Sequence, residues 1–520
     1  MNNDFRYGID ELTIGQTIRL ADGSLTGILS PEALERIEAS RQSVKDIIDH
    51  HTTVYGVNTG FGILANTRIP EDDTLTLQHK ILQSHSVGVG APIPVEIARI
   101  MLITKLHALA RGYSGVQVST LRRMIWHIEK DVIPVVPEKG SVGASGDLAP
   151  LAHLFLPLIG LGEVFYKNLR YPSREILEKF GQEPIRLGPK EGLALINGTQ
   201  FILSYAVKAV QRLHNCLEAA DIIGAMSLEA LTGTKSPFDE RLHLLRPFRG
   251  SLLVARRLRI LLSDSAIMQS HIDCGRVQDP YSLRCMPQVH GASRNAWLHL
   301  KEMVEIELNA VTDNPVIFGP HDTISGGNFH GQPLALPLDY GCFAASEIGN
   351  IADRRCYLLL EGKWGLPLLL MSKVGLNSGF MLPQYTTAAL VTENKTLCFP
   401  ASADSIPTSL GQEDHVSMGS ISGRKLNQVL DNLEYILAIE LMSACQAIEF
   451  RRPLKSSRIL EEAHGYTRNF VEFASEDRIF AADIDKLAGI IRDYSFVGNL
   501  DRVALSAGIV LNEGFEAFTI

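Results

Sequence analysis

The sequence predicts a mainly α-helical protein with a core of long, bundled helices and a smaller mixed domain at its N-terminus. Long segments rich in Ala, Leu, Ile and Met carry apolar residues at helical spacing with few charges on any face, and strand patterns are sparse. No Pro/Ser-rich linker, low-complexity tract or charge run divides the 520 residues into several domains. We expect a mixed domain over residues 1–112 and a large helical domain over residues 113–520.

Composition is that of an ordinary globular protein. Hydrophobic residues make up 45% and charged residues 21% of the chain, which suffices to bury a large core. A net charge of -9 argues against nucleic-acid and anionic-membrane partners, which favour a basic surface. The N-terminus lacks the features of a signal peptide, and the seven cysteines are scattered without a C-x-x-C pair. We therefore expect reduced cysteines and a cytoplasmic location.

The N-terminal part combines short elements with a glycine-rich loop. Residues 12–27 are turn-rich and predict a hairpin, whereas residues 30–51 predict a capped amphipathic helix. The loop that follows contains a G-x-G-x-x-A spacing over residues 60–65, but no acidic residue follows at the ribose-binding offset and no βαβ pattern is present. A dinucleotide site is therefore disfavoured. Tyr55, in the same loop, is either a core tyrosine or a general base whose pKa has been lowered.

Beyond this loop the pattern is overwhelmingly helical. Residues 148–162 are uncharged, but prolines and glycines interrupt them, so we expect a buried, broken helix rather than a membrane span. Several of the longer segments are apolar all round, which suits helices buried inside a bundle or an oligomer. The predicted long helices cover residues 95–112, 200–233, 293–311, 339–362 and 424–450.

One glycine-rich stretch, residues 140–147 (GSVGASGD), stands out for its chemistry. Its glycines permit a tight turn, and Asp147 predicts a cap for the helix that follows. The spacing fits neither a nucleophile elbow nor a P-loop. Chemistry also permits the triplet to cyclise: the Gly146 nitrogen attacks the Ala144 carbonyl, and water is lost, including the Ser145 hydroxyl. The product is a ring with an exocyclic methylidene group, which is an electrophile.

Three other stretches carry candidate residues that also have ordinary structural interpretations. His85, in the pair Ser84-His85, has no partner at metal-ligand spacing, and no metal site is expected. Asn197 stands three residues before Gln200, which fits either a capping box or a substrate contact. Phe329 lies in a second glycine-rich loop, which taken alone is only a loop.

Two further stretches contain charged residues with alternative roles. Gln278, Tyr281 and Arg284 recur every third residue, so in a helical turn they would share one face. An Arg so placed can bind a carboxylate bidentately, although a structural salt bridge would look the same in sequence. Glu413, in the stretch from Ser409 to His415, fits a capping box with acids in the first helical turn, or a group that binds an imidazole.

The string GSVGASGDLAPLAH, residues 140–153, closely resembles the signature of the aromatic amino acid ammonia-lyases, and the other stretches resemble motifs of that family in the same order. This resemblance implies that Ala144, Ser145 and Gly146 form a 4-methylidene-imidazol-5-one (MIO) prosthetic group, with no metal or diffusible cofactor required. It implies that Tyr55, Glu413 and Tyr281 act in catalysis. It also implies that the substrate-binding residues are His85, Asn197, Gln278, Arg284 and Phe329, with Asn314 a weaker neighbour.

Within the family, the pair Ser84-His85 resembles the histidine-specific members, whereas tyrosine lyases tend to show His-Leu and phenylalanine lyases Phe-Leu. Glu413 agrees, because a carboxylate can bind an imidazole. The resemblance thus implies elimination of ammonia from L-histidine to give trans-urocanate, by a homotetramer whose active sites are shared between subunits. It leaves open whether Tyr55 or Glu413 is the base and whether the substrate's amine or ring is attacked. The alternatives are a family member acting on another aromatic amino acid, including a 2,3-aminomutase, and a non-catalytic scaffold.

Overall fold

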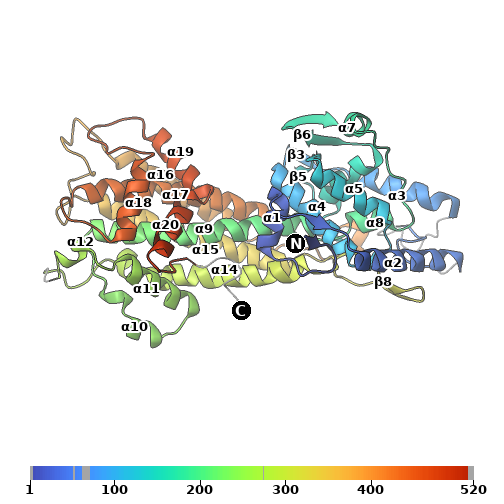
Figure 1. The fold of residues 1–520 in the computed structure, drawn as a ribbon, viewed down its shortest axis with the longest axis horizontal. Coiled ribbons are helices and arrows are strands. Elements are labelled where there is room, and N and C mark those ends of the chain that lie inside the picture. The colour runs from blue at the N-terminus through green and yellow to red at the C-terminus, as the bar shows by residue number, and fades with distance from the viewer. Residues whose placement is uncertain (1–3, 51–52, 61–70, 273–274, 513–520) are drawn as a thin grey trace. The chain divides into compact units, whose positions relative to one another are not determined.

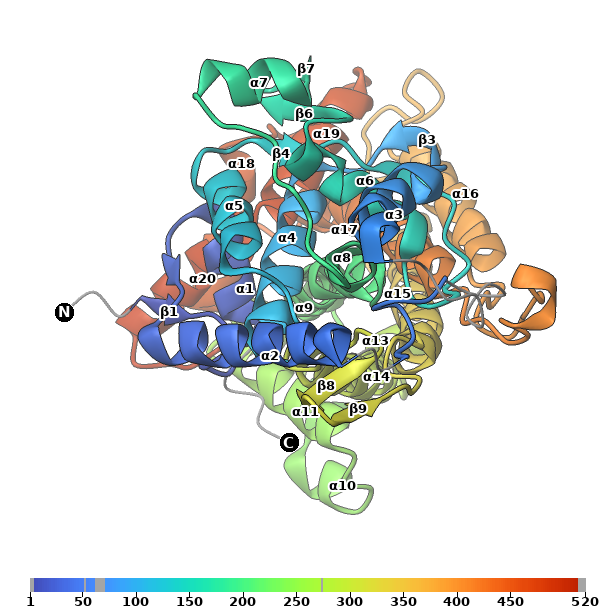
Figure 2. The same cartoon turned by 90° about the vertical axis from the view of Figure 1, so that its right-hand side faces the viewer.

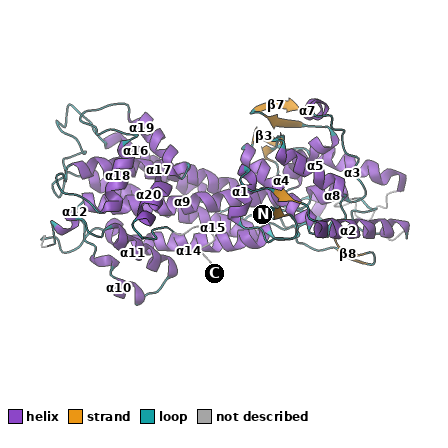
Figure 3. Cartoon of the chain, viewed as in Figure 1, coloured by secondary structure: helices purple, strands orange, loops and turns teal. Residues whose placement is uncertain are grey.

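The structure is a computed structural model that describes residues 4–50, 53–60, 71–272 and 275–512, and its helices α1–α20 far outweigh its short strands (Figures 1 and 3). The predicted mainly α fold is confirmed. Contacts group the chain into two compact units. Unit 1 comprises Met1–Lys208, Glu302–Leu338 and Pro400–Arg424, and unit 2 comprises Ala209–Lys301, Asp339–Phe399 and Lys425–Ile520. The boundary predicted after residue 112 is not one of these divisions and stays a prediction.

The predicted hairpin over residues 12–27 is wrong, because most of this segment is helix α1 (Ile14–Asp22). Thr13 and Gln16 form a reciprocal capping box at its start, and Gly23 ends it in the left-handed conformation. The next predicted helix is confirmed as α2 (Pro31–Asp49), capped by Ser30. The disfavoured dinucleotide spacing over residues 60–65 lies almost entirely outside the described residues.

All named strands belong to unit 1 and form small sheets (Figure 3). Strand β1 (Phe5–Arg6) pairs with β2 (Gly27–Ile28) in parallel, and β3 (Val89–Pro92) pairs with β5 (Pro137–Lys139) in antiparallel fashion. An antiparallel three-stranded sheet has the order β4 (Ile133–Pro134), β6 (Glu163–Tyr166), β7 (Leu169–Pro172). A hairpin joins β8 (Val316–Gly319) and β9 (Asp322–Ile324). Mixed structure thus extends beyond residue 112.

Helices α1, α2 and α5 (Val118–Glu129) pack against α4 (Val95–Ala110), and Figure 2 shows α5 beside α4. Almost every α4 residue after its first turn is buried, as its all-round apolar pattern predicts. The predicted broken helix is confirmed as α6 (Leu148–Phe155) followed by a 3₁₀ turn with Pro157 inside it. The other helices of this unit are α3 (Glu71–His85), α7 (Ser173–Lys179) and α8 (Glu191–Ile196).

The four long helices predicted after residue 200 are present, and three of them start earlier than predicted. They are α9 (Gln200–Ala230), α14 (Met286–Leu308), α15 (Gln332–Leu360) and α17 (Gly419–Glu449). Unit 2 adds α10 (Glu240–Leu244), α11 (Arg249–Leu261), α12 (Ala266–Gln269), α13 (Tyr281–Arg284), α16 (Met381–Leu397), α18 (Arg458–Arg468), α19 (Phe480–Arg492) and α20 (Ser495–Ser506). Among the described residues, no helix is long and apolar enough to cross a membrane.

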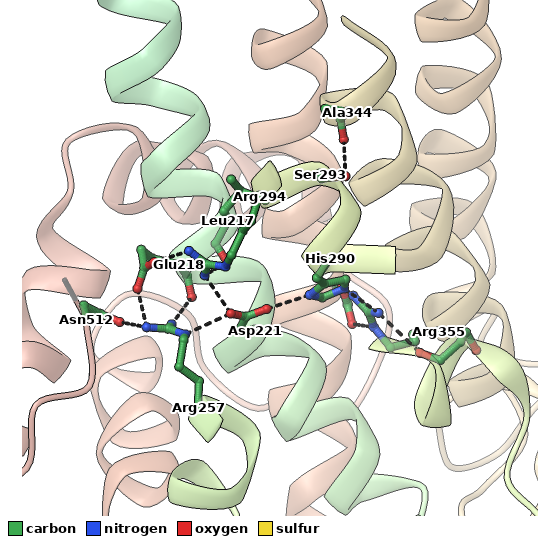
Figure 4. A network of polar contacts seen from close by, with 12 residues as sticks. Leu217, Glu218, Asp221, Arg257, His290, Ser293, Arg294, Ala344, Arg355 and Asn512 are labelled. Carbon is green, nitrogen blue, oxygen red and sulfur yellow. Dashed lines mark hydrogen bonds and ion pairs between the residues drawn. The ribbon is translucent and has the colours of Figure 1, made fainter. Parts of the chain in front are cut away.

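A buried network of charges joins helices α9, α11 and α14 within unit 2 (Figure 4). The Asp221 carboxylate accepts hydrogen bonds from Arg257 at 2.8 Å and Arg294 at 2.7 Å, and its other oxygen lies 2.7 Å from His290 Nδ1. Glu218 pairs with the same two arginines. Because each carboxylate has two guanidinium partners, burial of these ions is well compensated.

Candidate active site

The Ala144-Ser145-Gly146 triplet is held in a strained turn in unit 1. Ser145 has φ +53°, in the left-handed region that residues other than glycine seldom adopt, and Gly146 has φ +80°. A Cβ atom at Gly146 would lie 2.1 Å from the carbonyl oxygen of Gly198, so only glycine fits. The turn therefore brings together backbone strain and an unhindered amide nitrogen, the two features on which the predicted cyclisation depends.

The segment Asn197-Gly198 holds this turn from one side. The Asn197 side-chain amide donates to the Ser145 carbonyl oxygen at 2.8 Å, and the Asp147 N–H donates to the Gly198 carbonyl at 2.7 Å. The capping box predicted from Asn197 and Gln200 is not formed. Asn197 instead ends α8, and its side chain contacts a residue 52 positions earlier in the chain.

The sequence predicted that Asp147 caps α6, the helix that follows it, but its side chain makes no capping hydrogen bond there. Its carboxylate accepts the backbone N–H of Ile202 at 3.0 Å and the Ser141 hydroxyl at 2.9 Å, so it caps the start of α9 instead. Burial raises the pKa of Asp147 to about 7, although these hydrogen bonds favour its charged form. A fully buried carboxyl with a pKa near neutrality thus adjoins the triplet.

Glu413 reaches the triplet from a distant part of the chain. One of its carboxylate oxygens lies 3.5 Å from the Ser145 hydroxyl, and the other accepts the Thr408 hydroxyl at 3.0 Å. The capping box predicted over Ser409–His415 is wrong, because Ser409 and Leu410 have positive φ and form only a 3₁₀ turn. The next helix, α17, begins at Gly419.

His85 is the last residue of α3 and lies close enough to Glu413 for their charges to interact. Burial lowers the pKa of His85, while a hydrogen bond to Ile81 and the Glu413 carboxylate act in the opposite direction. The Ser84 hydroxyl lies 3.0 Å from His85 Nδ1. The structure therefore brings Ser145, Asn197, His85 and Glu413 into one neighbourhood.

Phe329 is half-buried in a loop that Asn314 fastens at one end. The Asn314 side chain accepts the Gly326 N–H at 2.7 Å and donates to the Ser325 hydroxyl at 3.1 Å. At the other end of the loop, His330 Nε2 lies 3.3 Å from His415 Nδ1, which joins the Phe329 loop to the Glu413 loop. Sequence reasoning missed this histidine pair, whose signal is one histidine within two residues of each candidate, Phe329 and Glu413.

Tyr55 is half-buried in a turn closed by hydrogen bonds from Val54 to Asn58 and from Gly56 to Thr59. This geometry fits both interpretations of Tyr55, as a core tyrosine and as a base. Its catalytic role stays a prediction.

The remaining candidates belong to unit 2. Tyr281 and Arg284 share the short helix α13, with the Arg284 guanidinium 4.6 Å above the Tyr281 ring, and Gln278 precedes that helix. Arg284 Nε donates to the Asp279 carbonyl at 3.0 Å, and no carboxylate in the described part of the chain lies within ion-pair distance of Arg284. Tyr281 is 71% exposed, and Gln278 is also exposed. Arg284 therefore forms no salt bridge with a described residue, and its guanidinium keeps donors for a ligand.

A family model described as aromatic amino acid lyase matches residues 12–469. The chain belongs to this family. A histidine ammonia-lyase of Desulfotalea psychrophila is 45% identical to this lyase over 95% of the chain and 97% of the relative, and one of Sorangium cellulosum is 48% identical over 91% and 94%. The crystal structure of histidine ammonia-lyase from Trypanosoma cruzi is 40% identical, with a TM-score of 0.88 and coverage of 96% and 95%. The predicted family is thereby confirmed.

The same fold serves related chemistry. A tyrosine aminomutase from Streptomyces globisporus is 33% identical to this lyase, with a TM-score of 0.91 over 96% of this chain and 98% of the other. Fold similarity therefore does not choose between members of the family, and the choice of substrate has to be argued from the site.

Proposed function

We propose that this lyase is a histidine ammonia-lyase, which eliminates ammonia from L-histidine and releases trans-urocanate. The observation that carries this proposal is the Glu413 carboxylate, which lies 3.5 Å from the Ser145 hydroxyl and interacts with His85. An imidazole has a ring N–H to donate to a carboxylate, whereas a phenyl ring has none. Curated relatives covering nearly the whole chain are named for the same activity.

We assign the prosthetic group to Ala144, Ser145 and Gly146, which fit an autocatalytically formed MIO group. The turn is already bent, Gly146 has no side chain to obstruct closure, and the Ser145 carbonyl has the Asn197 amide as a donor. The MIO group supplies an electrophile that makes loss of ammonia from the substrate feasible. The Asn197 Oδ1 atom is buried and accepts no hydrogen bond from a described residue, so it can accept one from substrate.

Other side chains bind and orient the substrate in this proposal. Arg284 binds the carboxylate of L-histidine through two parallel N–H donors, assisted by Tyr281 and Gln278. Phe329 supports the ring, and Glu413 and His85 hold the imidazole. The proton on the substrate's β-carbon is removed by Tyr55 or by Glu413, a step for which general-base assistance is typically worth about 100- to 10,000-fold.

We further propose a cytoplasmic homotetramer whose active sites combine residues of different subunits. Gln278 and Tyr281 lie exposed in unit 2, and Arg284 is half-buried beside them, where a neighbouring subunit could use them. Along α15, large apolar side chains are exposed at Tyr340, Phe343 and Tyr357, whose spacing places them along one face of the helix. An apolar stripe of this kind is typical of an interface between helices of an oligomer.

The test is the near-ultraviolet absorbance of urocanate in purified protein mixed with L-histidine, with Ser145→Ala measured beside it. We expect urocanate from the wild type, and a loss of at least about 1,000-fold in the variant, as when other enzymes lose a covalent catalyst. Activity on tyrosine or phenylalanine instead would retain the prosthetic group and overturn the assigned substrate. A β-amino acid product would identify an aminomutase.

A further inference from the structure

Helix α4 carries a single lysine in its buried core. Lys105 is 1% exposed, and its neighbours along the helix from Ile100 to Ala110 are almost all apolar and buried. A buried ammonium group is costly unless it has compensating partners, so its partners indicate its purpose. Its Nζ donates a hydrogen bond to the backbone carbonyl oxygen of Asn197.

That carbonyl belongs to the short segment that clamps the triplet. Asn197 Nδ2 donates to the Ser145 carbonyl at 2.8 Å, and the Gly198 N–H donates to the same oxygen at 3.4 Å. In return, the Asp147 N–H donates to the Gly198 carbonyl at 2.7 Å. The Asn197-Gly198 segment therefore holds the turn on both sides of Gly146, and Lys105 holds the segment from behind.

The charges around Lys105 favour a positioning role over an ion pair. Nearby Asp313 is already paired with Lys190 at 2.8 Å, and both of those side chains are buried. Asp147, the other neighbouring carboxyl, has Ile202 and Ser141 as its hydrogen-bond donors. Burial lowers the pKa of Lys105 to about 7, and Lys190 acts in the same direction, while Asp313 and Asp147 oppose it. The direct hydrogen-bond acceptor of Lys105 is the carbonyl of the clamp.

We propose that Lys105 is a positioning residue for the self-made prosthetic group. Through the Asn197 carbonyl it fixes the Asn197-Gly198 segment against the turn, and so aligns Ser145 and Gly146 for ring closure. This inference rests on the proposed MIO chemistry and adds to it a residue that makes no contact with substrate.

Ring closure needs alignment and no outside reagent. The Gly146 nitrogen bonds to the Ala144 carbonyl carbon, and one water leaves with that carbonyl's oxygen and the amide hydrogens of Ser145 and Gly146. A second water carries away the Ser145 hydroxyl and the hydrogen on its Cα. The Ser145 carbonyl group is retained, with its carbon in the ring and its oxygen outside it, so the donors that Lys105 positions act on the same atom before and after closure.

The experiment measures the mass of the intact, denatured chain together with steady-state kinetics. Lys105→Met removes the donor, Lys105→Gln keeps an N–H without the charge, and Lys105→Arg keeps both. Lys301→Met is the matched control, because Lys301 is a buried lysine of unit 2. Circular dichroism and melting establish which variants fold.

We expect the fraction of chains that retain both waters to rise from wild type through Lys105→Gln to Lys105→Met, with Lys105→Arg and Lys301→Met close to wild type. The kcat of Lys105→Met should fall about 10- to 100-fold with KM for L-histidine nearly unchanged, because the groups assigned to the substrate's carboxylate and imidazole are untouched. If Lys105→Met does not fold, Lys105→Gln decides. If folded Lys105→Met or folded Lys105→Gln had lost both waters completely and kept the wild-type kcat, the inference would be overturned. A wild-type chain without the mass deficit would instead overturn the proposed function.

Discussion

Two sets of buried charged groups, the Asp221 network of unit 2 and the groups Lys105 and Asp147 of unit 1, are compensated differently. In unit 2, arginines around Asp221 and Glu218 hold the pKa of both carboxyls below the usual value, although burial acts to raise it. In unit 1, Lys105 donates to a backbone carbonyl and Asp147 accepts a backbone N–H and a hydroxyl. Burial moves the pKa of each of these two groups to about 7.

This difference indicates a structural role for the Asp221 network and a chemical role for the groups around Ser145. Buried ions that neutralise one another are fixed in their charged forms and join helices. Buried groups with mostly neutral partners can have a pKa close to the ambient pH, so that they gain or lose a proton at little cost in free energy. Such pKa values are typical of catalytic sites. We therefore expect substitutions in the Asp221 network to change stability, and substitutions around Ser145 to change chemistry.

The largest effect on stability is expected from Arg257→Met, which leaves Asp221 and Glu218 with one guanidinium partner fewer. Removing one member of a buried ion network typically costs about 3–5 kcal/mol of unfolding free energy. Urea unfolding would measure this loss, and kcat per folded molecule should hardly change. Arg256→Met, at an exposed neighbouring position, is the control. A loss below about 1 kcal/mol would show that the network contributes little.

Glu413→Gln should change substrate binding and leave stability almost unchanged, the opposite of what is expected for Arg257→Met. Gln keeps the shape of the side chain but loses the negative charge, so KM for L-histidine should rise about 10- to 100-fold, the range for a hydrogen bond to a charged group. The half-buried position predicts little change in melting temperature. Asp414→Asn, at the exposed adjacent residue, serves as control. Unchanged KM would argue against an imidazole contact at Glu413.

Acid should weaken unit 1 through His127 while the Asp221 and Glu218 carboxylates of unit 2 stay charged. Burial lowers the pKa of His127 to about 4 from the usual 6.5, so between these values the unfolded chain binds more protons and stability falls as pH falls. The loss expected between about pH 7 and about pH 5 is roughly 2 kcal/mol. The lowered pKa values of Asp221 and Glu218 keep these two carboxylates charged over this range.

His127→Asn tests that expectation, because an Asn amide can keep the hydrogen bond that His127 Nδ1 makes with the Val132 carbonyl at 2.7 Å. Urea unfolding at the two pH values should show a flatter dependence in the variant. An unaltered slope would assign the acid sensitivity to other groups, of which His107 is the next, since burial also lowers its pKa to about 4.

The smallest effect is expected at the surface of α2, where Arg36 and Glu32 form an ion pair of 2.7 Å with both side chains half-exposed. Exposed pairs of this spacing contribute about 0.3–0.5 kcal/mol. Glu32→Gln should therefore leave the urea midpoint almost unchanged. A loss comparable to that of Arg257→Met would contradict the distinction between exposed and buried pairs.

Sequence periodicity predicted the long helices well, because a helix that is apolar all round leaves a strong pattern. It failed at residues 12–27, where Gly and Thr suggested turns although Thr13 and Gln16 form a capping box. Turn composition and capping chemistry use the same residue types, so only the reciprocal pair separates them.

The site residues were predicted from stretches that resemble the family's motifs in the same order, but local reasoning suggested wrong contacts for two of them. Asn197 and Glu413 both fit capping boxes, yet they meet Ser145 across 52 and 268 residues. Contacts at such separations are set by tertiary packing and leave no trace in local spacing. Lys105 was missed for the same reason, since a lone lysine in an apolar helix gains its meaning only from the carbonyl it meets.

The fit between Gly146 and Gly198 also bears on how the chain's reactivity is controlled. An unfolded chain carries only ordinary amides and a serine hydroxyl at this place, since nothing there holds Ser145 at positive φ. If closure requires the packed turn, the electrophile arises only in molecules that have folded correctly. Misfolded copies then carry no electrophile and do not react with the thiols and amines around them.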